Sequence, residues 1–407
     1  MRTATLDRWH GARSRVAEEL RIAAVGVSVE AIDGVRDYAL VLADALRAEG
    51  VSCSLHWLST YGLTGARHTH MRAWTRALPD QVRDAGADAL LFHYSAFSYY
   101  RRGLPLLVHP MVTALRRCGV PLLTTGHELA YPWRREGAKG MVWASADRVA
   151  LRELVAASDA VVVTTEFRLR WLRSRWWLPT RPISSAPVFS NLPPPAVRPP
   201  AARIVPELGL FGYALDAGTI SLVLDAMRSL LERGLEPRLL LLGRPGRWGA
   251  ADEWSRQARA RGLSHALSFP GVLAAQELSD VLARCDALLY AQPIGPTSCK
   301  GTLAGSLASG RPLVALEGRR RWQQLLDADA ARVVPRDALA LADALTELLD
   351  DPRTSETLGA RGRAFAEQEM GVARTLEVVV GLLQSTLHSR ARDQRARATS
   401  HEAHAAR

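Results

Sequence analysis

The sequence predicts an α/β protein made of two doubly wound, Rossmann-like domains that face a cleft. Short apolar runs alternate with longer amphipathic segments, which is the pattern of βα units on a parallel sheet. A proline-rich stretch interrupts this alternation, which then restarts. The length of 407 residues also suits two ordinary domains better than one. Ligands of such sheets bind at the carboxyl ends of the strands, so we expect the site in the cleft.

Residues 21–191 form the predicted N-terminal domain, preceded by an extension over 1–20. The apolar run RIAAVGV gives the first strand, and the helical YALVLADALRAEG ends on a glycine suited to a C-cap. Further strands are predicted at VSCSLHWL, ALLFHY, PLLTTG, AVVVTT and PISSAPVFSN. The extension lacks the apolar core of a signal peptide, and no stretch approaches the roughly 20 apolar residues that span a bilayer.

The middle of the chain predicts a linker. Residues 191–207 contain six prolines in seventeen positions, which excludes a helix interior or a central strand. We expect an exposed hinge over 192–205, followed by a second domain over 206–370. Its predicted strands are LGLFGY, PRLLLLG, LSFPG, ALLYAQ, RPLVAL and ARVVP.

The end of the chain predicts a helix over 371–387 and a basic tail over 388–407. The tail has five arginines against two acids and no apolar periodicity, which favours disorder. The whole chain has a formal charge of +11, which favours anionic partners such as nucleotides or phospholipid surfaces. Because the basic excess is spread out and partly in the tail, no nucleic-acid partner is expected.

The cysteines indicate a reducing compartment. Cys53, Cys118, Cys285 and Cys299 lie far apart and form no CxxC pair. Neither a zinc site nor a disulfide framework is therefore expected, and the protein is predicted to be cytoplasmic, with membrane association left open.

The turn GPTSCKGTLAGSLASG, residues 295–310, is a candidate anion site. It contains Lys300, one of only two lysines against 50 arginines, beside Gly301. A helix that starts near Thr297 or Ser298 would gather backbone N–H groups and the ammonium around one point. Gly295 and Gly301 would let the backbone approach a phosphate. The alternative is an ordinary hydroxyl-capped turn with a solvated lysine.

His127 and Glu128, in TTGHELAYP, follow a strand of the first domain and are candidate catalytic residues. A histidine there can contact an acceptor hydroxyl, and a carboxylate can orient it. The alternative is a histidine that only caps the turn. His93 also ends a predicted strand, where a packed core histidine is the favoured interpretation. Lys139, in REGAKG, is best interpreted as a solvent-exposed turn lysine.

In chain order these fragments resemble the GT-B glycosyltransferases of the family-4 or group-1 kind. The resemblance covers roughly residues 21–385, and Leu267–Leu316 carries most of its specificity. It implies a nucleotide-sugar donor held mainly by the C-terminal domain, an acceptor held mainly by the N-terminal domain, and no cofactor or essential metal. It also implies that the 371–387 helix crosses back to the N-terminal domain. EAIDGVRD, with Asp33, Gly34 and Arg36, resembles the glycine loop near donor phosphates and acceptor; a mobile βα loop is the alternative.

The sequence departs from this family at the donor site. Thr297 and Gly305 stand where the family has a glutamate pair, and the loop GYALDAGT lacks the usual arginine and lysine. Lys300 and Arg244 remain as cations for a diphosphate. The expected donor site comprises Gly212, Arg244, Gly295, Thr297, Ser298, Lys300, Gly301 and Thr302.

The segment RLRWLRSRWWLPTRP, residues 168–182, interleaves arginines with Trp171, Trp176 and Trp177. Indoles and guanidinium groups in this arrangement suit a phospholipid headgroup layer, although burial of the indoles in a core explains the pattern as well. Peripheral membrane contact is therefore one hypothesis for this segment.

Together these observations predict a glycosyltransferase that moves a sugar, expected to be a hexosyl group, from a nucleoside-diphosphate donor to a hydroxyl acceptor. Retention of the anomeric configuration is one outcome that the resemblance allows. Two alternatives remain open: a non-catalytic GT-B partner protein, which would explain the missing glutamates, and a sugar-nucleotide epimerase. The sugar, the nucleotide, the acceptor, the pathway and the oligomeric state are not determined by the sequence.

Overall fold

The computed structural model describes residues 20–405, apart from 64, 102–103, 131, 134–136, 197–204 and 245–248, with side chains through Arg392. It divides into two compact units: unit 1 comprises residues 1–187 and 372–407, and unit 2 comprises residues 188–371. Each unit carries one parallel, six-stranded sheet.

Unit 1 has the strand order β2-β1-β3-β4-β5-β6, with all pairings parallel. Its elements are β1 (Arg21–Ser28), α2 (Gly34–Ala48), β2 (Ser52–Ser59), α3 (Arg67–Asp84), β3 (Ala89–Ser95), the 3₁₀ turn η1 (Ala96–Tyr99), α4 (Val108–Arg117), β4 (Leu122–Glu128), α5 (Gly137–Ala157), β5 (Ala160–Val163), α6 (Glu166–Arg173), β6 (Ile183–Ser185) and α14 (Val372–Ala405).

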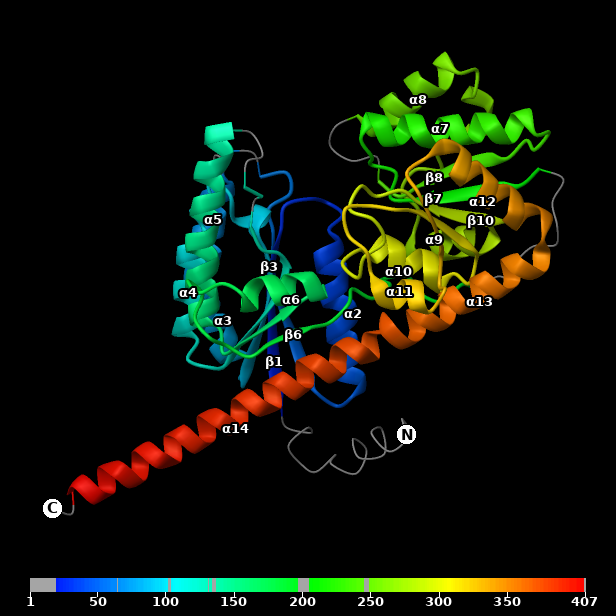
Figure 1. Cartoon of the computed structure of the whole chain (residues 1–407). Coiled ribbons are helices and arrows are strands. Elements are labelled where there is room, and N and C mark those ends of the chain that lie inside the picture. The colour runs from blue at the N-terminus through cyan, green and yellow to red at the C-terminus, as the bar shows by residue number, and fades with distance from the viewer. Residues whose placement is uncertain are drawn as a thin grey trace. The chain divides into compact units, whose positions relative to one another are not determined.

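Helices cover both faces of the first sheet. Helices α3, α4 and α5 pack in sequence along one face, whereas α2 and α14 lie together on the other (Figure 1). The strands β1, β3, β4 and β5 are buried almost throughout. This explains why they appear in the sequence as continuous apolar runs rather than as alternating ones.

Unit 2 has the strand order β12-β11-β10-β7-β8-β9, again all parallel. Its elements are β7 (Glu207–Phe211), α7 (Ala217–Glu232), β8 (Arg238–Leu242), α8 (Ala250–Ala260), η2 (Ser264–Ala266), β9 (Leu267–Ser268), α9 (Ala275–Arg284), β10 (Ala287–Tyr290), α10 (Gly301–Ala308), β11 (Leu313–Leu316), α11 (Gln323–Asp327), β12 (Arg332–Val334), α12 (Ala338–Asp350) and α13 (Pro352–Glu369).

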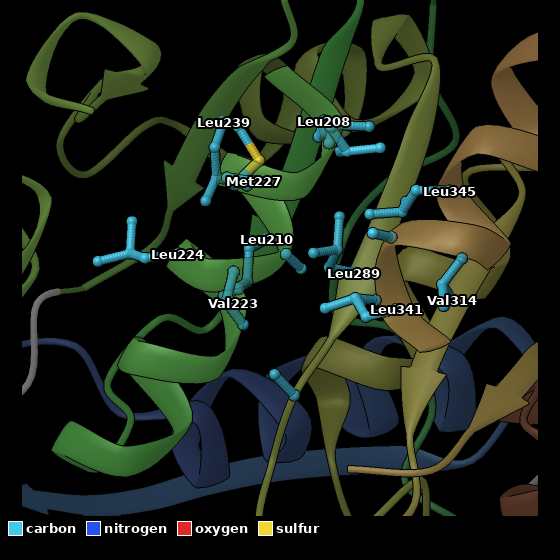
Figure 2. Packing of buried hydrophobic residues seen from close by; sticks show 14 of the residues in the cluster. Leu208, Leu210, Val223, Leu224, Met227, Leu239, Leu289, Val314, Leu341 and Leu345 are labelled. Carbon is cyan, nitrogen blue, oxygen red and sulfur yellow. The ribbon is translucent and has the colours of Figure 1, made fainter. Parts of the chain in front are cut away.

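The core of unit 2 lies on both faces of its sheet. On one face, Leu208, Leu210 and Leu289 pack against apolar residues of α7 and α12 (Figure 2). On the other face, Leu288 and Leu313 pack with α9, α10 and α13. The Gly-rich turn before α10 is thus fixed to a rigid sheet by apolar burial.

The described part of the proline-rich segment makes hydrogen bonds with unit 2. Pro193 accepts a hydrogen bond from the Ser279 hydroxyl at 2.6 Å, and the Ala196 amide donates to Asp280 at 2.7 Å. Leu192 packs against the core of unit 2. Residues 192–196 are therefore attached to unit 2 although Pro194 and Ala196 are exposed, because proline carbonyls still accept hydrogen bonds although proline lacks an N–H. Residues 197–204 lie outside the described part.

The C-terminal segment is helical, whereas the sequence favours disorder after residue 387. Helix α14 runs without a break from Val372 to Ala405. Alanine and arginine are good helix formers, and residues 388–405 contain no proline or glycine that would end the helix. The basic composition therefore did not determine the backbone state.

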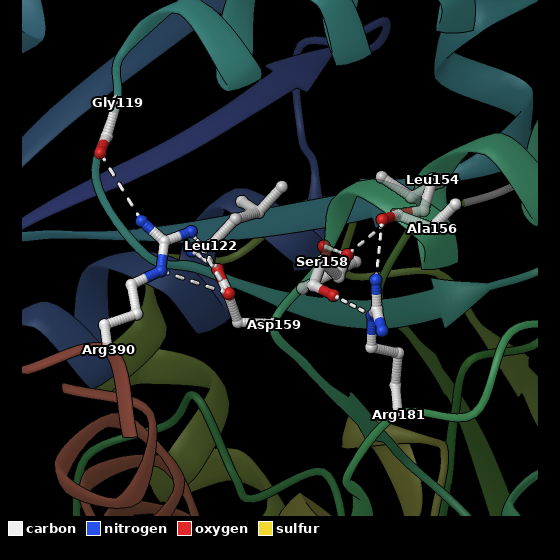
Figure 3. Close-up of polar contacts among 9 residues, drawn as sticks. Gly119, Leu122, Leu154, Ala156, Ser158, Asp159, Arg181 and Arg390 are labelled. Atoms are coloured by element: carbon white, nitrogen blue, oxygen red, sulfur yellow. Dashed lines mark hydrogen bonds and ion pairs between the residues drawn. The ribbon is translucent and has the colours of Figure 1, made fainter. Parts of the chain in front are cut away.

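Arg390 attaches this helix to unit 1. Its guanidinium group contacts both carboxylate oxygens of Asp159, at 2.8 Å and 3.1 Å, and donates to the Gly119 carbonyl at 3.4 Å (Figure 3). Asp159 also accepts from the Leu122 amide at 2.8 Å. Arg390, the third residue of the predicted tail, thus bonds to residues that precede β4 and β5.

Candidate functional site

The turn between β10 and α10 is the first part of the candidate site. Helix α10 begins at Gly301, three to four residues later than the expected start near Thr297 or Ser298, with Lys300 at its N-cap position. No side chain caps this helix. Its first N–H groups therefore have the arrangement that favours an anion, beside the partly exposed Lys300.

The helix starts late because Thr297 and Ser298 are drawn into the protein. Both are buried, and the Ser298 carbonyl accepts a hydrogen bond from the Val188 amide at 2.7 Å. The Thr297 hydroxyl lies 3.2 Å from the Cys299 sulfur. The two hydroxyl residues thus form the inner wall of the turn, whereas Lys300 and Gly301 are partly exposed.

Gly295 is packed against the loop after β11. Its φ of 86° lies in the left-handed region, and a Cβ there would come within 2.8 Å of the Arg320 carbonyl. Gly318, in the loop after β11, approaches so closely that a Cβ on it would lie 2.0 Å from the Gly295 nitrogen. This pair of glycines lets the β11 loop support the turn backbone to backbone.

Gly212 lies beside the start of α10. It follows β7 with a φ of 88°, and a Cβ there would lie 2.9 Å from the Thr302 methyl group. The side-chain amide of Gln292 donates to the Gly212 carbonyl at 3.0 Å. Because β7 pairs with β8 on one side and with β10 on the other, these residues lie at the topological switch point, where ligands of doubly wound sheets bind.

Arg244 follows β8, the strand next to β7, by two residues, so it lies at the same edge of the sheet. Sequence reasoning missed another cation at this edge. Arg336 follows β12 and donates to the Thr219 hydroxyl at 2.5 Å. Arg336 lines one side of a depression of about 540 Å³, and the loops after β10 and β11 line the other. The lining residues are Asp216, Pro293, Glu317, Gly318, Arg319 and Arg336. A charged residue directly after the predicted strand ARVVP is the signal that could have identified it.

The position of the second missing glutamate is filled. Gly305 lies in α10 and is buried, and a Cβ there would be 3.2 Å from both the Leu192 and the Phe211 side chains. A side chain at this position would therefore press on apolar atoms, so the structure leaves little room for a glutamate at residue 305.

His127, near the end of β4, is the centre of the candidate site in unit 1. Its Nε2 lies 3.3 Å from Nδ1 of His93 on β3. Tyr38 of α2 packs edge-on against the His127 ring, with the centroids 5.0 Å apart. Because β3 and β4 are neighbours in a parallel sheet, the two histidines meet at the same edge.

Both histidines are held neutral. Burial lowers the pKa of His93 to about 3. Burial also lowers the pKa of His127 well below its usual 6.5, with His93 and the guanidinium group of Arg168 adding to the effect. A neutral imidazole can accept a proton or a hydrogen bond from a hydroxyl group, so His127 has the protonation state required of a base.

Glu128 faces another partner. Successive side chains of a strand point to opposite faces, so His127 and Glu128 diverge on β4. The Ser95 hydroxyl donates to Glu128 at 3.5 Å. His127 instead has its ring contact with His93, which was expected to be a core histidine and is 2% exposed, in addition to Tyr38.

The glycine loop precedes α2. Asp33 is the N-cap, and its carboxylate accepts from the Val35 amide at 2.9 Å. A Cβ on Gly34 would meet nothing within 4 Å, and Arg36 is exposed. The loop therefore leaves space around Gly34 at the end of β1, while α2 places Tyr38 against His127.

The three tryptophans of the segment 168–182 differ in environment. Trp176 is 94% exposed, whereas Trp171 and Trp177 pack partly against the core near β5 and α6. The guanidinium carbon of Arg175 lies 5.6 Å from the centre of the Trp171 ring. One indole is thus exposed, and two attach its segment to unit 1.

Among the described residues, no group of three or more His, Cys, Asp or Glu side chains is placed to hold a metal ion. No helix in this part of the chain is long and apolar enough to cross a membrane.

Comparisons with known proteins identify the class of fold. Residues 207–351 match the family of glycosyl transferases group 1. No curated protein matches the chain in sequence. Sucrose-phosphate synthase from Thermosynechococcus elongatus is structurally similar, with a TM-score of 0.67 and 17% identity over 91% of this chain and 100% of that one.

Two further structures show how widely this fold is used. HepE from Anabaena, solved in complex with UDP and glucose, has a TM-score of 0.61 and 12% identity over 89% of this chain and 99% of that one. UDP-GlcNAc 2-epimerase from Neisseria meningitidis has a TM-score of 0.54 and 10% identity over 90% of this chain and 100% of that one. At these identities the likeness establishes the fold alone.

The predicted α/β fold with two Rossmann-like domains is confirmed, and so is the resemblance to group-1 glycosyltransferases. The family match includes β7, the turn before α10 and Lys300. The chain has the GT-B fold, and residues 207–351 carry the glycosyl transferases group 1 domain.

Proposed function

We propose that this protein transfers a hexosyl group, with retention of configuration, from a nucleoside-diphosphate sugar to a hydroxyl acceptor. The observation that carries the proposal is the start of α10. A helix without a side-chain cap, Lys300 and Gly212 meet at the switch point of a domain that matches a glycosyltransferase family.

On the donor side, the chemistry is neutralisation of a departing diphosphate. A helix N-terminus offers about half a positive charge, and an ammonium offers one more. Arg244 lies at the same sheet edge and can supply another. These groups stabilise charge that develops in the transition state, so no side chain need attack the sugar.

On the acceptor side, His127 is proposed to bind the acceptor hydroxyl. A neutral imidazole accepts the hydroxyl hydrogen bond and increases the nucleophilicity of the oxygen. Its contact with His93 selects which ring nitrogen is available. Glu128, bonded to Ser95, is assigned to binding the acceptor at the adjacent strand end.

The proposed reaction uses no metal or cofactor, because cationic side chains and a helix N-terminus take the charge of the leaving group. Turnover should therefore be the same with and without a chelator. A turnover that requires added Mg²⁺ or Mn²⁺ contradicts this part of the proposal. The four cysteines form no disulfide in the described structure, which suits a reducing compartment, so we place the reaction in the cytoplasm. Trp171, Trp176 and Trp177 are proposed to make a peripheral membrane contact there.

A panel of nucleotide sugars screened by thermal shift tests the donor assignment. A ligand that binds only the folded state raises its stability by an amount that increases with affinity, so the panel ranks donors without knowledge of the acceptor. The best donor is then incubated alone, and slow hydrolysis to the nucleoside diphosphate is expected. The anomeric configuration of the product, read by NMR, decides between retention and inversion.

A non-catalytic GT-B partner protein is the second candidate, favoured by the filled Gly305 position. It predicts nucleotide binding without hydrolysis or transfer. Epimerisation would instead change the configuration at one sugar carbon without releasing the nucleotide. The hydrolysis experiment therefore separates the three functions.

A further inference from the structure

The outer face of α5 is unusually apolar for a helix surface. Val142 is 60% exposed and Val149 is 70% exposed, and Met141 is also exposed. These residues share one side of the helix, since they lie at spacings of seven and eight positions. The opposite side carries the buried residues of the helix, such as Leu151. Apolar side chains thus lie on both sides of this helix.

Cationic side chains connect this face to the tryptophan segment. Arg148 of α5 lies 4.1 Å above the Trp133 ring and is close enough to Arg175 for the two charges to interact. Arg175 in turn stacks near Trp171, and Arg152 donates to the Trp177 carbonyl at 3.0 Å. The outer face of α5 and the exposed Trp176 therefore belong to one surface, which we call the α5 surface.

The acidic residues of α5 leave this surface cationic. Asp147 is fully buried and accepts a hydrogen bond from the Tyr100 hydroxyl at 2.5 Å. Glu153 pairs with His109 at 2.6 Å. The four cations Lys139, Arg148, Arg152 and Arg175 therefore outnumber Glu153, the one acid of α5 that is not fully buried. An occupant of the α5 surface must accept apolar side chains and carry negative charge.

We propose that the α5 surface docks on an anionic phospholipid bilayer. The exposed valines and Trp176 would enter the boundary between headgroups and acyl chains, while the guanidinium groups bind lipid phosphates. A second copy of the chain is a poorer occupant, because a two-fold interface would place arginine against arginine. This proposal rests on the peripheral membrane contact of the proposed function. It adds that the lipid is anionic and that α5 contacts it.

Sedimentation of the full-length protein with vesicles tests the proposal. One set contains phosphatidylcholine with about one third phosphatidylglycerol, and the other contains phosphatidylcholine alone. We expect binding to the anionic vesicles that weakens with added salt, and at least about tenfold weaker binding to the neutral ones. The variant Val142→Ser/Val149→Ser should lose at least about tenfold in partitioning to anionic vesicles, since two apolar side chains no longer insert.

A matched control is Leu339→Ser on α12 of unit 2, where the leucine is 59% exposed. It removes an equally exposed apolar side chain outside the α5 surface and should leave vesicle binding unchanged. If the double valine variant fails to fold, Trp176→Ser replaces it, because Trp176 makes little contact with the protein. Wild-type binding by either folded variant overturns the proposal.

Other outcomes also overturn it. Absence of vesicle binding excludes a lipid partner, and a dimer that Val142→Ser/Val149→Ser dissociates shows an interface between copies. Full competition by inorganic phosphate would identify a soluble anion site instead. Titration of UDP into the same preparations monitors the donor site, so loss of vesicle binding with intact nucleotide binding refutes this inference alone.

Discussion

Lys300 and Lys139 are the only lysines of the chain, and they give a matched pair for testing the donor site. Lys300 stands at the start of α10, whereas Lys139 lies 4.7 Å above the Trp143 ring on α5. Lys300→Ala should weaken nucleoside-diphosphate binding by about 1.5–3 kcal/mol, the range for a charge-assisted hydrogen bond. Lys139→Ala should leave that affinity unchanged. Calorimetric titration measures both, and equal affinities would restore the interpretation of a capped turn with a solvated lysine.

His127 gives the corresponding test on the acceptor side. His127→Ala should lower the turnover by about a hundredfold, which is typical for a positioned proton acceptor. The affinity for nucleoside diphosphate should not change, because the proposed donor residues lie in unit 2. Steady-state kinetics with the preferred donor, paired with calorimetry, separates the two effects. A parallel loss of donor affinity would contradict the assignment.

The histidine pair also makes a prediction about acid stability. In the unfolded chain each imidazole takes up a proton below a pH of about 6.5, whereas folded His93 stays neutral down to a pH of about 3. The unfolded state therefore binds more protons in this window, and stability falls as the pH drops from 6.5 towards 3. Each histidine can contribute up to about 1.4 kcal/mol per pH unit.

Urea unfolding at a series of pH values measures this slope. His93→Gln removes one titrating group, so the variant should lose stability less steeply on acidification, whatever its stability at neutral pH. The same slope in both proteins would show that His93 is accessible to protons in the folded state.

At the scale of single elements, α10 shows why the donor site differs from the family pattern. Its Gly305 is packed against Leu192 and Phe211, so Gly305→Glu would force a carboxylate into an apolar contact. We expect a loss of stability above about 3 kcal/mol, as for a buried unpaired charge. Gly305→Ala should cost much less, because the neighbours must move by only a few tenths of an ångström and alanine is the better helix former. Thermal denaturation compares the two, and a stable Gly305→Glu protein would show that the family carboxylate still fits.

The elements also show what the sequence could and could not predict. Strands such as Ala160–Val163 were predictable because a strand buried on both faces must be apolar throughout. The start of α10 was not, because Ser298 is held by a hydrogen bond from Val188, far away in the sequence. His93 was identified as buried, but its contact with His127 depends on the neighbouring β3 and β4, which a single sequence does not reveal. Local patterns thus predicted elements, and long-range contacts determined the site.

At the scale of the whole molecule, the two units have separate cores, and α14 belongs to the first. Leu383 of α14 is buried, and Thr375 donates to the Pro187 carbonyl at 3.3 Å in unit 1. Leu348 of α12 is buried in the core of unit 2. Each of these leucines therefore reports on the stability of one unit.

Leu383→Ala should lower the unfolding temperature of unit 1, and Leu348→Ala that of unit 2, each by the equivalent of about 2–4 kcal/mol for a buried leucine. Nucleoside diphosphate should raise only the transition that Leu348→Ala lowers, because the proposed donor site lies within unit 2 and a ligand stabilises the unit that it binds. Differential scanning calorimetry of both variants, with and without the ligand, distinguishes the two transitions. A single transition that both substitutions shift equally would mean that the units unfold as one cooperative body, and a ligand effect on the transition of unit 1 would move the nucleotide site away from Lys300.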